Sequence, residues 1–301
     1  METLALLGLP SCEFFKPFIV TGLALGGVYA VSGVGMLVLY RTTGVLNLAF
    51  GAVGAMGAFI AWQLIESTTL PHWVAYLSCI GFGGVVTLLY GVLFGPPLAG
   101  RDSLTKAVAT LGLALILLGA MSWIWTDKAR SLNLPTTNSG FEVAGVLVNW
   151  TQVIAVGLGV VMTVVTILFL RHTRTGTAMR ALADDREITA TLGVPVRRVE
   201  ASAWFVSGLI SGAAGLLLAN LVGLDAATLT FLVISAVAAM LIARLGSVAV
   251  TLAAGFVVGL VNAMITPILS ISQYRDMTPF VLATIALLWV SRKDVRVTGL
   301  R

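Results

Sequence analysis

Long apolar runs make up most of this sequence, and they constrain its fold more than any other feature. Hydrophobic residues account for 58% of the 301 residues and charged residues for 10%, and the mean hydropathy is +1.01. A soluble domain carries about 25% charged residues. Because a helix needs about 20 residues to cross a bilayer, we expect an all-α, polytopic integral membrane protein with about 8–9 transmembrane helices. The predicted spans are Pro17–Tyr40, Gly44–Ile65, His72–Phe94, Leu104–Trp125, Thr151–Leu170, Glu200–Leu221, Thr228–Ala243, Val248–Leu269 and Thr278–Val290.

One long polar segment, Arg171–Arg198, interrupts the apolar runs. Asp184 is expected to cap a helix there, with Glu187 three residues on in the position of a capping box. This helix, about residues 185–192, is expected to end at Gly193. A helix of about two turns is unstable alone in water. We therefore expect a partner protein to hold it.

Basic residues are unevenly distributed between the loops. If the polar segment is cytoplasmic and the spans alternate, fourteen of the eighteen Lys and Arg residues lie on the cytoplasmic side. This distribution agrees with the positive-inside rule. We expect an N-terminus outside, a cytoplasmic C-terminus and a location in the cell inner or plasma membrane. The four basic residues left outside are Lys16, Lys128, Arg130 and Arg275.

The apolar runs lack residues that several function classes require. No Asp, Glu, Lys or Arg lies well inside a predicted span, whereas proton-driven carriers generally use such a residue. The sequence contains no GxxxxGK[ST] phosphate loop and no spacing typical of a catalytic triad or a metal site. We expect a chain that is not an enzyme, holds no metal or cofactor and binds no nucleic acid. Its pathway suits a neutral or zwitterionic solute.

A second polar stretch, residues 126–150, ends in the alternating sequence FEVAGVLVNW. This pattern predicts a small β-hairpin on the membrane surface. The whole chain, residues 1–301, is expected to form a single transmembrane domain that includes the polar loop 171–198.

Four motifs occur in an order typical of one transporter family. The run Gly22–Phe59 contains a Gly-Leu pair, a Tyr-Ala pair and Gly-Val-x-Asn, and ATLGL follows at Ala109–Leu113. In the polar segment, Glu187 and Gly193 have the spacing of a Glu-Ala-Ala-x-x-x-Gly pattern, and GLISGAAGLLLA occupies Gly208–Ala219. Together these motifs resemble those of permease subunits of branched-chain amino acid (Liv-type) ABC importers.

The resemblance implies a permease that moves branched-chain amino acids or related small organic solutes by alternating access. It also implies a second permease subunit, identical or homologous, two ATPase subunits that bind ATP-Mg, and an extracytoplasmic substrate-binding protein. The short helix would be the coupling helix that docks in the ATPase. The implied ATPase-coupling residues are Asp184, Asp185, Arg186, Glu187 and Gly193.

Two observations keep other interpretations open. Leu48 and Phe50 stand where the family has Phe and His, which leaves the solute undetermined. A stand-alone channel or facilitator for small neutral solutes would also favour charge-free, Gly-rich spans. A passive channel has no need of a capped cytoplasmic helix, so that helix and copurification with an ATPase discriminate between the two classes.

Candidate pathway residues lie in the second and fourth predicted spans. Asn47 places an amide in an apolar stretch, where an unpaired polar group is costly, so it either lines the pathway or bonds to a neighbouring helix. Gly51, Gly54 and, less closely, Gly44 fall along one side of a predicted helix. Such a side either lines a cavity or lets another helix approach. The candidates are Asn47, Gly51, Gly54, Thr110 and Gly112.

Overall fold

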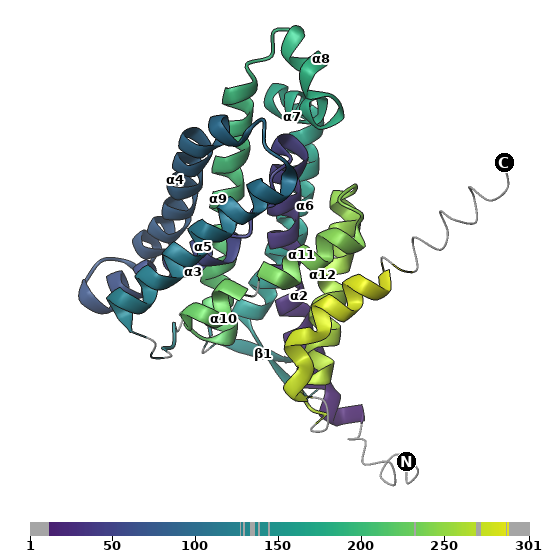
Figure 1. Cartoon of the computed structure of the whole chain (residues 1–301). Helices are drawn as coiled ribbons and strands as arrows, with labels where there is room; N and C mark the ends of the chain where they lie inside the picture. The colour runs from purple at the N-terminus through teal and green to yellow at the C-terminus, as the bar shows by residue number, and fades with distance from the viewer. Residues whose placement is uncertain are drawn as a thin grey trace, which may run out of the picture. The chain divides into compact units, whose positions relative to one another are not determined.

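A computed structural model describes residues 12–288, except 127, 129, 133–135, 138, 144, 232, 269–271 and 287. Within these residues, seven helices are long and apolar enough to cross a membrane, which confirms the predicted all-α membrane architecture (Figure 1). The shorter helices α10 (Ala226–Phe231) and α11 (Val233–Ile242) occupy the seventh predicted span, and residues 278–286 of the ninth are helical. The seven long helices are α2 (Cys12–Thr43), α3 (Phe50–Ser67), α4 (His72–Leu98), α5 (Ser103–Trp125), α6 (Trp150–His172), α9 (Val196–Val222) and α12 (Val248–Ile265).

The polar parts of the chain form short elements. The predicted hairpin is confirmed: β1 (Gly140–Val143) pairs antiparallel with β2 (Val146–Asn149), so that Phe141 lies opposite Val148. Helices α7 (Arg174–Asp184) and α8 (Arg186–Thr191) make up most of the polar segment, and a 3₁₀ turn, η1, covers Ser272–Met277. Both chain ends, residues 1–11 and 289–301, lie outside the described residues. The sidedness of the termini stays a prediction.

The chain packs as two compact units, and the single-domain expectation stays a prediction. One unit holds the described parts of Met1–Gly33, Pro135–Val160 and Ile234–Arg301. In it α2 approaches α12 closely, since a Cβ on Gly26 would lie 2.8 Å from the Cα of Phe256. Gly27 of α2 approaches α6 in the same way, at 2.9 Å from the Cα of Val156. Small residues let these helices pack backbone to backbone.

The other unit holds the described parts of Val34–Leu134 and Val161–Val233. In it α9 packs against both α3 and α4. A Cβ on Gly208 of α9 would overlap the carbonyl oxygen of Gly83 in α4. The hydroxyl of Thr87 donates across the same contact to the carbonyl oxygen of Trp204, at 2.8 Å. These close contacts fix α3 and α4 on α9, and they position the functional site described next.

Candidate functional site

A short non-helical stretch, Gly44–Ala49, separates α2 from α3, so the second predicted span begins six residues later than expected, at Phe50. The chain leaves α2 at Gly44, whose φ is +69°, a conformation that glycine adopts without strain. The amide of Gly44 donates to the carbonyl oxygen of Tyr40 at 2.7 Å, which closes the end of α2. Gly44 is therefore a helix terminator, and the prediction that it shares a helical face with the glycines of α3 is wrong.

Thr110 of α5 holds the non-helical stretch Gly44–Ala49, called the break below, in place. Its hydroxyl accepts from the amide of Leu48 at 3.0 Å and donates toward the carbonyl oxygens of Leu46, at 3.0 Å, and Ala107, at 2.8 Å. The Thr110 side chain is fully buried. Asn47 lies between the two residues that Thr110 binds, so the structure brings together two of the predicted pathway residues.

The Asn47 side chain is 1% exposed and points its amide group at the start of α3. Its Oδ1 accepts from the amide of Ala49 at 3.1 Å, a local turn typical of Asn. Because a backbone N–H must meet an acceptor, this bond identifies which amide atom is the oxygen. The remaining atom, Nδ2, is buried and has no hydrogen-bond partner among the described residues.

The other predicted pathway glycines have three different surroundings. A Cβ on Gly51, in the first turn of α3, would overlap the carbonyl oxygen of Thr230 in α10. One on Gly54 would lie 2.6 Å from the carbonyl oxygen of Ser211 and 3.2 Å from the Cα of Gly215, both in α9. This geometry favours close helix packing as the role of Gly54. Gly112 lies on an exposed side of α5 with no atom within 4 Å of its Cβ position, so it is not brought to the break.

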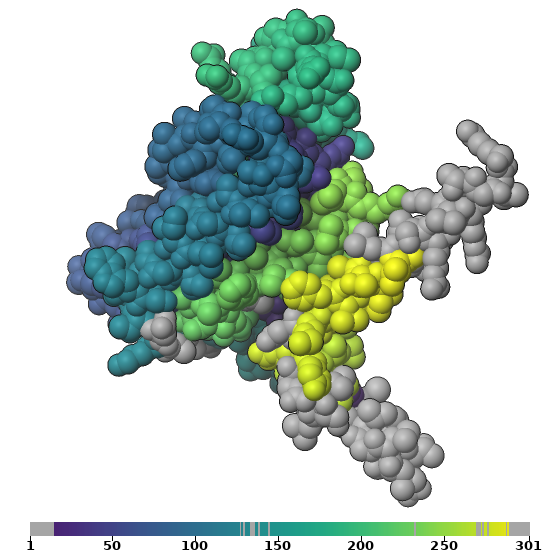
Figure 2. All heavy atoms as spheres, in the orientation of Figure 1, coloured from purple at the N-terminus to yellow at the C-terminus, as the bar shows by residue number. Residues whose placement is uncertain are grey.

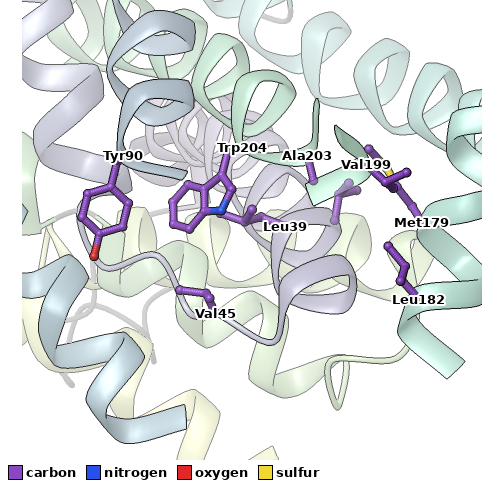
Figure 3. Packing of buried hydrophobic residues seen from close by; sticks show 9 residues of the cluster. Leu39, Val45, Tyr90, Met179, Leu182, Val199, Ala203 and Trp204 are labelled. Atoms are coloured by element: carbon purple, nitrogen blue, oxygen red, sulfur yellow. The ribbon is translucent and has the colours of Figure 1, made fainter. Parts of the chain in front are cut away.

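Helix α7 anchors the polar segment to the end of the second unit. The hydroxyl of Thr173 accepts from the amide of Gly176 at 2.9 Å and so caps α7. Two apolar side chains one turn apart, Met179 and Leu182, turn inward and are buried (Figure 3). They belong to a hydrophobic cluster with Val38, Leu39, Val45, Tyr90, Val199, Ala203 and Trp204. Helix α7 therefore shares one buried cluster with residues near the ends of α2, α4 and α9.

Helix α8 begins one residue later than predicted. Asp185, not Asp184, is the N-cap, and its carboxylate accepts from the amide of Ile188 at 2.9 Å. Asp184 is the last residue of α7 and is helical, whereas Asp185 is extended, with φ −153°, as a capping residue requires. Glu187 then occupies the second helical position, so the predicted capping box is wrong. The predicted end is confirmed: Gly193 has φ +83°.

The chain itself contributes to holding α8, and the expected contribution of a partner protein stays a prediction. The Nε and Nη2 atoms of Arg186 both lie 3.0 Å from Oε1 of Glu200 in α9. The Arg186 side chain is about half exposed, so such a pair contributes about 0–1 kcal/mol. The ion pair orients α8 without burying it.

Residues 184–188 are all exposed, and so are Leu192 and Gly193. Figure 2 shows α7 and α8, in teal and green, projecting beyond α4. Ile188 is 59% exposed and Leu192 is 76% exposed. The sequence prediction missed these two apolar side chains. Their spacing of four on a short polar helix, which places them on one side, was the available signal.

A pocket connects the break with the α7–α8 segment. Thr43 and Val45 line it on the side of the break, and Arg186 and Glu200 line it on the side of α8. Lys106 of α5 also faces it. The break and the exposed segment are therefore neighbours in one unit, joined by the pocket and by the buried cluster around Val45.

Comparison with known proteins identifies the family. Residues 18–288 match the family described as the permease component of the branched-chain amino acid transport system. The chain is 26% identical to the high-affinity branched-chain amino acid transport system permease protein LivH of Escherichia coli (strain K12), over 91% of this chain and 93% of that protein. It is 24% identical to BraD, the corresponding permease protein of Pseudomonas aeruginosa, over 93% and 95% of the two chains. It is 25% identical to a probable LivH of Methanocaldococcus jannaschii, over 77% and 75%.

The matched region contains the break, Thr110 and the whole α7–α8 segment. The seven apolar helices and these relatives together make the chain a multi-pass protein of the inner or plasma membrane. The chain belongs to the family of branched-chain amino acid transport system permease components.

Proposed function

We propose that this chain is the membrane-spanning subunit of an ABC importer that moves branched-chain amino acids or related small organic solutes inward by alternating access. The family match over residues 18–288 carries the proposal. The proposed partners are a second permease, identical or homologous, two ATPase subunits that hold ATP-Mg, and an extracytoplasmic binding protein that delivers the solute. The proposed orientation, N-terminus outside and C-terminus cytoplasmic, follows the distribution of basic residues.

The proposed coupling element is the α7–α8 segment. Asp184, Asp185, Arg186 and Glu187 are exposed polar side chains, and Ile188 and Leu192 add exposed apolar surface. Apolar anchors within a polar rim are typical of a docking surface. When ATP closes the ATPase pair, a force on α8 would pass through Met179 and Leu182 into the buried cluster. The ends of α2, α4 and α9 would then move together.

The proposed pathway passes the break between α2 and α3. Non-helical backbone is tolerated in a membrane protein where it is buried in protein or lines a cavity, and the residues of the break are half-buried or buried. Asn47 and Thr110 lie there, and Gly51 is in the first turn of the next helix. In transporters, helix N-termini that begin inside the protein can bind anionic groups of the solute. Gly54 lies in a contact with α9, and Gly112 lies on an exposed side of α5. We therefore propose that these two glycines contribute less to the pathway than Asn47 and Thr110.

A stand-alone channel or facilitator is the second candidate function. A passive channel gains nothing from the exposed apolar side chains of Ile188 and Leu192, which follow a helix, α7, that is anchored in the hydrophobic cluster. The α7–α8 geometry therefore favours the importer.

The test is purification of the tagged chain in mild detergent, followed by reconstitution of the copurified subunits in vesicles with the binding protein. We expect ATPase subunits to copurify, and uptake of radiolabelled L-leucine to require ATP and to be insensitive to an imposed proton gradient. Uptake by the chain alone, without an ATPase and following the gradient, would refute the importer and support a carrier or channel.

A further inference from the structure

Helix α3 begins inside the protein with hydrogen-bond donors that the chain does not use. Its N-cap is Ala49, which has no side-chain acceptor. The amide of Phe50 reaches the carbonyl oxygen of Asn47 at 3.4 Å, and that of Val53 bonds to Ala49 at 2.9 Å. Between them, the amides of Gly51 and Ala52 have no acceptor within the described part of the chain. Such first-turn amides are the groups that an external acceptor satisfies.

The Asn47 side chain adds a further donor to the same turn. Since its Oδ1 is bonded to the amide of Ala49, its Nδ2 lies beside the start of α3. That Nδ2 is buried and unpartnered, in a side chain that is 1% exposed. Buried donors are normally satisfied, so this atom is open to an acceptor group of a ligand. The donors of one side chain and two backbone amides call for an acceptor with several lone pairs.

The charges around the start of α3 indicate which kind of acceptor it binds. The N-terminus of a helix carries a partial positive charge and favours anions. The sequence from Phe14 to Ile65 contains no Asp or Glu, and neither do α5 and α10. No carboxylate of these elements competes for the donors. A carboxylate of the solute is the acceptor that fits.

Helix α10 covers this turn. The carbonyl oxygen of Thr230 packs on Gly51, where a Cβ would overlap it, and that of Leu229 would lie 3.0 Å from the same Cβ. The Thr230 hydroxyl is also buried, without a hydrogen-bond partner in the part of the chain that the structure describes. Next to the turn lies a small apolar cluster: Ala49, Ala52, Val53, Ala114 and Leu117. The start of α3 thus has α10 on one side and this apolar cluster beside it, and α10 covers the turn in the conformation described.

We propose that the start of α3 binds the α-carboxylate of the transported amino acid. Asn47 Nδ2, the amides of Gly51 and Ala52 and the Thr230 hydroxyl donate to it, while the small apolar cluster receives the aliphatic side chain. Thr110 is a positioning residue that fixes the backbone on both sides of Asn47. This assignment rests on the proposed function for the identity of the solute. Entry and exit require α10 to move away from Gly51.

The first experiment measures solute binding by the purified full-length chain, without the binding protein, whose own selectivity would mask the effect. We expect L-leucine to raise the thermal unfolding temperature, whereas L-leucinamide, which lacks the carboxylate, and ribose do not. Asn47→Asp keeps the acceptor for Ala49 but replaces the donor with a negative charge. It should weaken L-leucine binding by about tenfold or more.

Two further variants complete the design. Thr230→Val removes one donor at nearly constant volume and should weaken binding by about threefold. It repeats the test if Asn47→Asp fails to fold. Asn220→Asp makes the same chemical change in α9, where Asn220 bonds to the carbonyl oxygen of Leu132. It should leave the L-leucine concentration dependence unchanged, even if it lowers the unfolding temperature.

Equal stabilisation by L-leucine and L-leucinamide, no stabilisation of the wild-type chain, or unchanged binding by Asn47→Asp and Thr230→Val would overturn the assignment. ATP-driven uptake in reconstituted vesicles separates this outcome from failure of the proposed function. If uptake requires ATP while both variants bind and transport like wild type, the importer stands and the site is wrong. If L-leucine binds as described but uptake needs no ATPase, the site stands and the importer is wrong.

Discussion

Two regions of the same unit depend on glycine for opposite reasons. One is the contact between helices α4 and α9, and the other is the α7–α8 segment. At Gly208 the requirement is volume, because a methyl group would overlap the backbone of α4. At Gly193 no atom lies within 4 Å of the Cβ position, and the requirement is the positive φ. Changes in the interior contact should therefore alter stability, whereas changes on the exposed segment should alter coupling in a folded protein.

The largest effect is expected for Gly208→Leu. The added side chain must separate α4 from α9, and overpacking of this kind costs about 3 kcal/mol or more. We expect little monodisperse protein after detergent extraction, measured by size-exclusion chromatography. Gly112→Leu is the matched control on the exposed side of α5 and should change stability by about 0.5 kcal/mol at most. An equal loss in both variants would show that membrane insertion, not the α4–α9 contact, is affected.

Gly54→Leu tests whether the interior contact extends from α9 to α3. Because Gly54 meets the backbone of Ser211 and Gly215, we expect a loss of about 1–3 kcal/mol. Residual transport should be proportional to the amount of folded protein, measured by thermal unfolding and uptake on the same samples. A wild-type unfolding temperature combined with lost transport would instead assign Gly54 to the pathway.

On the exposed segment, Glu187→Lys and Leu192→Glu should act on coupling. A wrong charge or a lost apolar anchor at an interface costs at least about 1.4 kcal/mol, or about tenfold in affinity. We expect ATP-driven uptake and ATPase copurification to fall about tenfold, while the unfolding temperature of the isolated chain stays unchanged. Arg197→Lys keeps the charge of another exposed residue and serves as the control. Wild-type uptake by both variants would contradict docking through α8.

Gly193→Val isolates the backbone requirement. The φ of +83° costs a β-branched residue about 1–2 kcal/mol. We expect weaker docking and a small decrease in the unfolding temperature. Gly119→Val is the control, because Gly119 is also surrounded by open space but lies within helix α5 without a positive φ. A smaller decrease for Gly193→Val than for Gly119→Val would refute the strain argument.

The smallest effect concerns pH. The pKa of Asp102, the N-cap of α5, is lowered by hydrogen bonds from the hydroxyl and then the amide of Thr105. Since the folded pKa lies below the unfolded one, the carboxylate stabilises the fold above about pH 4 and loses this effect as the pH falls through the folded pKa. The difference in unfolding temperature between wild type and Asp102→Asn should shrink on acidification. A difference that is constant from pH 7 to pH 3 would contradict this.

Features that depend on neighbours in sequence were predicted well. The spans follow from the length of the apolar runs, because lipid accepts only internally bonded backbone. The hairpin followed from alternation, and the stop at Gly193 from a residue type that tolerates positive φ. The start of α8 was predicted one residue too early because Asp184 and Asp185 can both cap a helix. In the structure, Asp184 belongs to α7, whose side chains Met179 and Leu182 pack inward.

The sequence by itself determined the membrane class, the nearly complete set of spans and the family, because these depend on hydrophobicity and on motifs read along the chain. Only the tertiary structure decided where α3 begins, since Thr110 binds Leu46 and Leu48 from more than sixty residues away. It also decided that Gly54 and Gly112 face different surroundings. Such pairings depend on which helices become neighbours. That choice is set by packing between distant segments, which local sequence does not encode.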